Sequence, residues 1–159
     1  QTLIERTAQL IEPQCEAVTL VAARPNTYSD FQYPVIVDRF PNIGPLGGID
    51  SALNHVGDTG WTFICPCDLS YVGKNWLEIL IQHAGPTSDA VVFQGDRFEP
   101  LFTLYHSRIL PLVEEHIREK RLAPHHLFPK IQSVVLPLPP DWPAEPSFNT
   151  RESLDAFKD

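Results

Sequence analysis

The carboxylate best suited to chemistry in this chain is Asp68, which follows a short apolar segment. Residues Trp61–Cys65 are rich in β-forming side chains and predict a buried strand. Pro66 has no backbone N–H for a sheet hydrogen bond, so the strand should end there and leave Asp68 just past its carboxyl end. Ligands of open α/β sheets bind at that edge, and Mg²⁺ prefers oxygen ligands and substrate phosphates. Asp68 is therefore a candidate Mg²⁺ ligand; the alternative is that it only caps the following turn.

A second candidate site combines Asp38 with a glycine-rich turn. Asp38 follows the short apolar segment Pro34–Val37, and residues Asn42–Gly48 precede an apolar pattern with helical spacing. Because glycine has no Cβ, the backbone of Gly44-Pro45-Leu46-Gly47 can come close to a ligand. The alternative is a tight turn that only leads into a helix.

Patterns typical of strands and helices alternate along the chain. The expected strands are short apolar runs at Ala17–Ala23, Pro34–Val37, Trp61–Cys65, Asp89–Phe93, Pro100–Tyr105 and Ser133–Leu138. The expected helices have apolar faces over Thr2–Ile11, Ile49–Val56, Leu77–Ala84, Ile109–Ile117 and Leu122–Ile131, the last broken near Pro129, and a terminal helix is capped by Asn149. This alternation predicts a three-layer α/β fold with a mostly parallel sheet. Right-handed crossovers should bring Asp38, the glycine-rich turn and Asp68 to one edge.

The composition limits the class of protein. The 159 residues are enough for one domain with a substantial core, and 43% apolar residues argue against a disordered chain. The net charge of −8 argues against nucleic-acid binding through a broad basic surface. No apolar run approaches the length of a membrane span and no signal peptide is recognisable, so we expect no membrane contact. Three cysteines, an odd number, indicate a reducing compartment, and we expect a cytoplasmic location.

Five short segments, taken in order, resemble the molybdenum cofactor guanylyltransferase family. They are Asp38, Gly44-Pro45-Leu46-Gly47-Gly48-Ile49, Cys67-Asp68, Glu99-Pro100-Leu101-Phe102-Thr103-Leu104-Tyr105 and Phe148-Asn149-Thr150. Each segment alone is a weak signal, but their common order over nearly the whole chain is fairly specific. The resemblance implies a Rossmann-like nucleotidyltransferase fold. It also implies Mg²⁺-dependent transfer of GMP from GTP to molybdopterin, with release of pyrophosphate.

The resemblance implies a role for each matching residue. Asp68 would be the catalytic residue, because it would hold the Mg²⁺ that bridges phosphate oxygens. GTP would contact Arg24, Asp38 and the turn formed by Gly44, Pro45, Leu46 and Gly47. Molybdopterin would contact Pro100 and Asn149, and other proteins of molybdenum cofactor biosynthesis are expected partners. Attack by a pterin phosphate oxygen on the α-phosphorus needs charge neutralisation and in-line positioning rather than a covalent nucleophile.

The amino end departs from the family. The family opens with a strand and a glycine-rich loop, containing Arg and Lys, that holds the triphosphate; this chain begins at Gln1 without them and has no Met. We therefore expect residues 1–159 to be a single domain that is incomplete at its amino end by about thirty residues, the size of a βα unit. In the family fold the first strand lies beside the strand that ends at Cys65. Without that strand the sheet would have a gap, so we expect either that upstream residues complete the sheet or that a rearranged strand or a neighbouring chain fills the gap.

Two further departures keep other functions open. Ala23 stands where the family usually has Asn, and Arg151 stands where Pro is common. One alternative is a cytidylyl- or sugar-nucleotidyltransferase of the same fold. The other is a catalytically degenerate relative that acts as a binding or regulatory protein.

Overall fold

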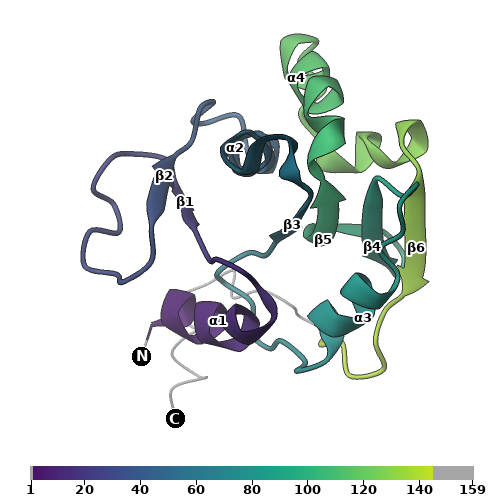
Figure 1. Cartoon of the computed structure of the whole chain (residues 1–159), viewed down its shortest axis with the longest axis horizontal. Coiled ribbons are helices and arrows are strands. Elements are labelled where there is room, and N and C mark those ends of the chain that lie inside the picture. Colours follow the sequence, from purple (N-terminus) through teal and green to yellow (C-terminus); the bar gives the residue numbers. More distant parts are fainter. Residues whose placement is uncertain (1, 145–159) are drawn as a thin grey trace.

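The structure is a computed structural model that describes residues 2–144 (Figure 1). Its α-helices are α1 (Leu3–Ile11), α2 (Pro45–Val56), α3 (Trp76–Gln82) and α4 (Leu110–Arg118). Its 3₁₀ turns are η1 (Glu12–Gln14), η2 (Gly57–Thr59), η3 (Ser107–Ile109), η4 (Pro124–His126) and η5 (Phe128–Lys130). Its strands are β1 (Leu20–Ala22), β2 (Val35–Val37), β3 (Trp61–Ile64), β4 (Ala90–Gln94), β5 (Phe98–His106) and β6 (Ser133–Pro137). None of the described helices has the length and apolarity that crossing a membrane requires.

Helix α2 begins and ends at glycines, and it starts at Pro45 rather than at the expected Ile49, so Pro45–Gly48 of the predicted glycine-rich turn are its first residues. Gly44 is the N-cap with φ of +89°, a conformation that side-chain-bearing residues rarely adopt, and Pro45 occupies the first helical position. Gly57, with φ of +68°, ends the helix. Between them, Leu46 and Ile49 are fully buried. The glycines therefore fix where α2 starts, and the apolar face fixes how it packs.

The strands form two sheets. In the first, β1 and β2 are parallel, with Leu20 opposite Val35 and Ala22 opposite Val37. The second has the order β3-β5-β4-β6. Strand β5 is antiparallel to both β3 and β4, whereas β4 and β6 are parallel. The molecule is therefore an α/β protein with mixed strand directions.

The prediction of a mostly parallel sheet is wrong for the described strands. Only residues 95–97 connect β4 to β5, whereas a parallel connection needs a dozen or more residues. Strand β5 must therefore turn back antiparallel, and it lies between β3 and β4. The closeness of the two predicted strands was visible in the sequence, but the place of β5 in the sheet was not.

The remaining predicted elements occur with altered ends. The strand expected at Ala17–Ala23 is reduced to Leu20–Ala22. The helix expected at Leu122–Ile131 is instead the two 3₁₀ turns η4 and η5, each with a proline in its first turn. Proline lacks the N–H that a longer helix would need, which explains the interruption. The expected terminal helix and its cap Asn149 lie outside the described residues.

Helices cover both faces of the four-stranded sheet, which confirms the three layers (Figure 1). The first four residues of β4 are all buried, and their side chains alternate between the two faces with the period of two that a strand imposes. Ala90 and Val92 pack with Leu46 and Ile49 of α2 and with residues of α4. Val91 and Phe93 pack in the opposite core with residues of α3. Each face of this sheet therefore has its own apolar core.

The core beneath α3 is rich in aromatic side chains. Trp76 is 2% exposed and stacks on Trp142 with ring centroids 4.6 Å apart. Its indole Nε1 donates a 2.8 Å hydrogen bond to Asp141. Aromatic pairs of this kind add about 0.5–1.5 kcal/mol beyond the area that they bury. Leu69 and Val72 belong to the same core, so it anchors the loop that follows β3.

Among residues 2–144, β1 and β3 each pair on one side only, β1 with β2 and β3 with β5. Helix α2 contacts strands of both sheets and joins them (Figure 1). A further strand beside β3, implied by the family resemblance, stays a prediction.

Candidate functional site

The candidate residues lie at the ends of β2 and β3 and at the start of α2. Asp38 follows β2 directly, α2 then starts at Pro45, and Asp68 follows β3. The crossover rule holds for parallel strands of one sheet, whereas β2 and β3 belong to different sheets that α2 joins. The convergence of Asp38, the glycine-rich turn and Asp68 therefore stays a prediction.

The Asp68 carboxylate is half-buried on the loop after β3. Pairing of β3 with β5 ends at Ile64, opposite Thr103, just before Pro66. Within residues 2–144 the Asp68 side chain has no hydrogen-bond or ion-pair partner, so its oxygens are available to a ligand. The next residue, Leu69, is 3% exposed, which holds the main chain at this point.

Asp38 is held by main-chain and side-chain donors. Its backbone N–H extends the β1–β2 ladder with a 2.8 Å bond to the Ala22 carbonyl. Its Oδ1 accepts a 2.8 Å bond from the Phe40 N–H and lies 3.2 Å from Ser51 Oγ. Oδ2 has no hydrogen-bond partner among the described residues. One oxygen therefore fixes the side chain and the other remains available.

Gly47 is required by the close approach of α2 to Asp38. A Cβ at position 47 would lie 2.7 Å from the Phe40 carbonyl oxygen and 3.0 Å from Asp38 Oδ1. The same addition at Gly48 would meet nothing within 4 Å. The two neighbouring glycines therefore differ: Gly47 lets the helix pack against the Asp38 turn, and Gly48 does not contribute to that contact.

Ser51 and its neighbours were not predicted as site residues. Ser51 is 2% exposed, and its hydroxyl accepts a 2.8 Å bond from the Arg39 N–H. The single hydroxyl proton is shared between the Gly47 carbonyl at 2.8 Å and Asp38 Oδ1 at 3.2 Å. Ser51 thus joins α2 to the two residues that directly follow β2. A polar residue inside the apolar helix pattern was the available sequence signal.

Asp50 is a fully buried carboxylate beside this network. Arg39 Nη1 lies 3.2 Å from Asp50 Oδ2, and Arg39 Nη2 lies 3.2 Å from Glu114 Oε1 of α4. Burial raises the pKa of Asp50, and the Arg39 guanidinium opposes that rise. Arg39 therefore ties the turn after β2 to two helices.

The other predicted nucleotide contacts differ in accessibility. Leu46 is fully buried, so only its main chain can face a ligand. Gly44 and Pro45 are exposed at the start of α2. Arg24 is exposed on the loop after β1, where its carbonyl accepts a 2.7 Å bond from Thr27 Oγ1. Because Ala22 pairs with Val37, Arg24 and Asp38 lie on the same edge of the β1–β2 sheet.

Pro100 lies in an irregular part of β5. The register shifts between the pairs Val92–Thr103 and Gln94–Phe98, so β5 bulges over the intervening residues. The Pro100 carbonyl accepts a 2.8 Å bond from Tyr105 Oη, which stabilises the bulge. Bulges of this kind often redirect residues beside functional sites. The other predicted acceptor contact, Asn149, lies outside the described residues.

A hollow of about 430 Å³ lies beside the bulge, lined by Gly95, Asp96, Arg97, Glu99, Leu138, Pro139, Trp142, Pro143 and Ala144. Burial raises the pKa of its Glu99 carboxyl, against the effect of Arg97. Because β3 and β4 are both antiparallel to β5, this hollow and Asp68 lie at the same edge of the four-stranded sheet. Glu99 is thus a second carboxyl group near the predicted acceptor side.

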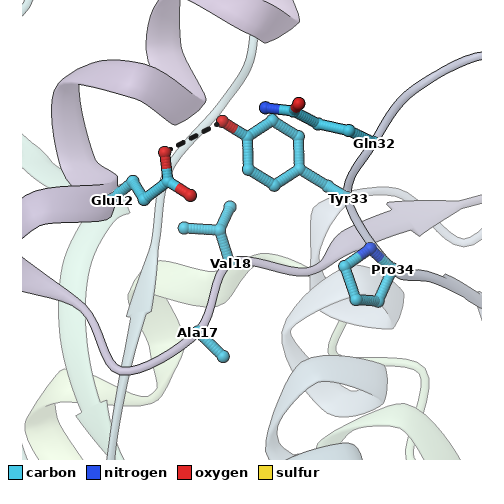
Figure 2. Close-up of a pocket in the computed structure, with 6 residues that line it drawn as sticks. All are labelled: Glu12, Ala17, Val18, Gln32, Tyr33 and Pro34. Atoms are coloured by element: carbon cyan, nitrogen blue, oxygen red, sulfur yellow. Dashed lines mark hydrogen bonds between the residues drawn. The ribbon is translucent and has the colours of Figure 1, made fainter.

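A second hollow, of about 370 Å³, lies at the opposite ends of β1 and β2 (Figure 2). Its lining residues are Glu12, Ala17, Val18, Gln32, Tyr33 and Pro34. The Tyr33 hydroxyl points toward Glu12, with 3.3 Å between Oη and Oε2. These residues precede β1 and β2, whereas Asp38 follows β2, so this hollow is separate from the candidate site.

The donor set fits Mg²⁺ better than zinc. Within residues 2–144 no three His, Cys, Asp or Glu side chains are grouped to hold a metal ion. Burial raises the pKa of the Cys65 thiol, which keeps it protonated and unsuited to zinc. Mg²⁺ is commonly bound by one or two carboxylates together with substrate phosphates. Asp68, with its available oxygens, meets that requirement.

Comparison with known proteins identifies the family to which this chain belongs. Residues 1–132 match the family model described as the MobA-like NTP transferase domain. A molybdenum cofactor guanylyltransferase from Vibrio parahaemolyticus is 37% identical over 112 residues, covering 69% of this chain and 56% of that protein. One from Vibrio cholerae is 34% identical over 113 residues, covering 70% of this chain and 55% of that protein. The chain thus spans little more than half the length of these relatives.

Two solved structures share the fold. A protein from Aquifex aeolicus has a TM-score of 0.82 and 20% identity, covering 94% of this chain and 80% of its own. Molybdopterin-guanine dinucleotide biosynthesis protein A from Archaeoglobus fulgidus has a TM-score of 0.79 and 21% identity, covering 98% of this chain and 83% of its own. At these identities the likeness concerns the fold alone.

Proposed function

Because this chain belongs to the MobA-like NTP transferase domain family, we propose that the protein transfers GMP from GTP to molybdopterin and releases pyrophosphate. The names of the Vibrio relatives support this substrate pair. The observation that carries the proposal is the arrangement of Asp38, whose Oδ1 is fixed by the chain while Oδ2 has no partner among the described residues. We place the activity in the cytoplasm, which the free thiols of Cys15, Cys65 and Cys67 support.

In the proposed reaction, an oxygen of the molybdopterin phosphate forms a bond to the α-phosphorus of GTP. The bond from that phosphorus to the oxygen bridging the β-phosphate breaks, and pyrophosphate leaves with the electron pair. When bound, Mg²⁺ would neutralise charge on the phosphate oxygens. Asp68 would hold this ion, and Arg24 would contact the nucleotide from the loop after β1. Pro100 and Asn149 would contact molybdopterin.

Asp38 would select guanine. A carboxylate only accepts hydrogen bonds, and guanine presents an N–H and an NH₂ group side by side on one edge. Oδ2 would accept from one of these donors, while the main chain at Gly44–Gly47 approaches the base closely. Mg²⁺ would then bind beside the loop that follows β3, and molybdopterin beside the first residues of β5.

The nucleobase is tested by titration calorimetry on the natural polypeptide that contains these residues. With Mg²⁺ present, GTP should bind at least about ten-fold more tightly than CTP or ATP, a difference of about 1.4 kcal/mol. Asp38→Asn should reduce this preference, because an amide adds donors where guanine also donates. Equal affinities, or a preference for CTP, would favour a cytidylyl- or sugar-nucleotidyltransferase.

The chemistry is tested by following transfer of labelled GMP to molybdopterin. Asp68→Asn should lower turnover by a factor of about 100 or more, as removal of an electrostatic catalytic group commonly does. The matched control is Asp58→Asn, which changes an exposed carboxylate in η2 at the far end of α2. Full turnover in Asp68→Asn would remove Asp68 from the metal site. Tight GTP binding without any transfer by the wild type would favour a binding protein.

A further inference from the structure

Arg6 of α1 contacts the loop that carries Asp68. Its Nη1 donates a 3.3 Å hydrogen bond to the Ser70 carbonyl, and its Nη2 donates to the Leu69 carbonyl. These partners lie 64 and 63 residues further along the chain. Leu69 is the first residue after Asp68, and Ser70 is the second. One guanidinium from the first helix therefore binds the main chain immediately beyond the candidate metal ligand.

We propose that Arg6 is a positioning residue for Asp68: by binding the Leu69 and Ser70 carbonyls together, it fixes the main chain that aims the Asp68 carboxylate at the metal. This inference rests on the proposed function, in which Asp68 holds Mg²⁺. It assigns no contact between Arg6 and the substrate: the proposed effect of Arg6 on the metal is exerted through the loop.

The geometry suits arginine in particular. A guanidinium is planar and presents several N–H donors in a fixed fork, so it can bind two carbonyl oxygens at once. Lysine carries a compact ammonium group on a flexible stem and cannot impose the same relative placement of two carbonyls. Arg6 is half-buried, which reduces the competition of water for these bonds. The two hydrogen bonds therefore restrict the orientation of the loop.

The rest of the loop is anchored on its other side by burial. Leu69 is 3% exposed and Val72 is 8% exposed, and both belong to the aromatic core beneath α3. Tyr71 adds an exposed 3.2 Å hydrogen bond to Asp141. Apolar burial restrains the side chains of the loop, but it does not orient the peptide planes. Arg6 supplies that restraint, because it binds the carbonyls themselves.

The consequence concerns metal affinity more than nucleotide affinity. A carboxylate that samples more orientations spends less time in the one that binds the cation. Loss of groups that orient a metal ligand typically costs 10- to 100-fold in affinity or activity. Asp38 and the glycine-rich turn follow β2, whereas Arg6 binds the loop that follows β3, so GTP binding without metal should remain unchanged.

The test uses Arg6→Ala and Arg6→Lys in the natural polypeptide that contains these residues. Hydrogen exchange should show faster exchange of the amides of residues 68–72 in Arg6→Ala. Binding of Mn²⁺ in the presence of GTP, measured by electron paramagnetic resonance, should weaken about ten-fold. Arg6→Lys should lie between Arg6→Ala and the wild type. GTP affinity measured with EDTA should be unchanged in both variants.

The matched control is Arg108→Ala, which also removes an arginine bound to a backbone carbonyl. Arg108 Nη1 donates a 3.2 Å bond to the Pro86 carbonyl, before the start of β4 and therefore at the opposite edge of the sheet from Asp68. It should leave both the exchange of residues 68–72 and the Mn²⁺ affinity unchanged.

The outcomes distinguish the role of Arg6 from the proposed function itself. Unchanged exchange at residues 68–72, or Mn²⁺ affinity within two-fold of the wild type, in Arg6→Ala overturns the role of Arg6 alone. If Arg6→Ala does not fold, Arg6→Lys decides by the same two readouts. A wild-type protein that binds no Mn²⁺ with GTP overturns the proposed function, and the role of Arg6 with it.

Discussion

The β1–β2 sheet is short and mostly half-buried, whereas strand β4 of the four-stranded sheet is buried on both faces. In the first, Ala22 is the only strand residue that is buried, and Val37 is 45% exposed. In the second, Val91 and Val92 of β4 are completely buried in opposite cores. Each sheet nevertheless leads into one candidate carboxylate, Asp38 from the small sheet and Asp68 from the large one.

The difference shows two ways of holding a carboxylate in place. The small sheet buries too little apolar surface to fix the residues after β2, so Asp38 depends on α2, through Gly47 and the Ser51 hydroxyl. The loop after β3 of the large sheet is anchored by the buried side chains of Leu69 and Val72 and by the guanidinium of Arg6. Substitutions that alter the packing of α2 should therefore weaken nucleotide binding. Substitutions in the aromatic core should lower the stability of the fold.

The largest expected effect comes from comparing a valine-to-alanine substitution in the four-stranded sheet with one in the β1–β2 sheet. Val92→Ala should destabilise the protein by about 2–3 kcal/mol, because it removes buried methyl groups and leaves a cavity. Val37→Ala should change stability by no more than about 0.5–1 kcal/mol, because its side chain is already 45% exposed. Urea unfolding measures both values. Equal losses would show that the small sheet carries as much of the stability as the large one.

The second expected effect compares the two neighbouring glycines of α2. Gly47→Ala should displace the Asp38–Phe40 turn, because its Cβ would lie 2.7 Å from a backbone oxygen. We expect a stability loss of about 1–2 kcal/mol, as for other overpacked sites, and a GTP affinity reduced about ten-fold. Gly48→Ala meets nothing within 4 Å and should be neutral or stabilising by up to about 1 kcal/mol. Calorimetry that gives the two variants equal GTP affinity would contradict the role of Gly47.

The third effect compares two buried serines with similar hydrogen bonds. Ser51→Ala leaves the Arg39 N–H without its acceptor, and Ser88→Ala does the same to the Gly85 N–H, so each should cost about 1–2 kcal/mol of stability. Ser88 lies before β4, away from Asp38. We therefore expect weaker GTP binding only in Ser51→Ala. Weaker binding in both variants would attribute the effect to general loss of stability.

The smallest expected effect concerns the pH dependence of stability and a buried histidine of α4. His116 of α4 is fully buried, and within residues 2–144 neither ring nitrogen has a hydrogen-bond partner. Burial, followed by the nearby cations Arg121 and Lys130, lowers the pKa of His116. The unfolded chain therefore takes up a proton below about pH 6.5 more readily than the folded one, and stability falls as the pH drops through that range.

His116→Leu should remove this part of the pH dependence. The melting temperature of the variant should fall less between pH 7.5 and pH 5 than that of the wild type. His125→Ala, which changes an exposed histidine, is the control and should follow the wild type. Identical pH profiles for His116→Leu and the wild type would mean that His116 does not contribute.

Much of the local structure and the family could be predicted from the sequence. The end of β3 follows from Pro66, and a helix after Gly44 follows from the glycine-rich segment, although it starts at Pro45 and not at Ile49. These effects depend on the backbone of one residue and its nearest neighbours. The five short segments indicated the family that the match over residues 1–132 confirms. The position of Asp68 after a strand was predictable for the same local reason.

Only the tertiary structure decided how those pieces meet. The short connection makes β5 antiparallel to β4, but nothing local places β5 between β3 and β4, since pairing partners are chosen by the surface that the whole chain can bury. The Cβ-free contact of Gly47 with Phe40 and the bonds from Arg6 to Leu69 and Ser70 likewise depend on packing between separate elements. Propensity and capping act over a few residues, whereas these contacts join segments that become neighbours only when the cores form.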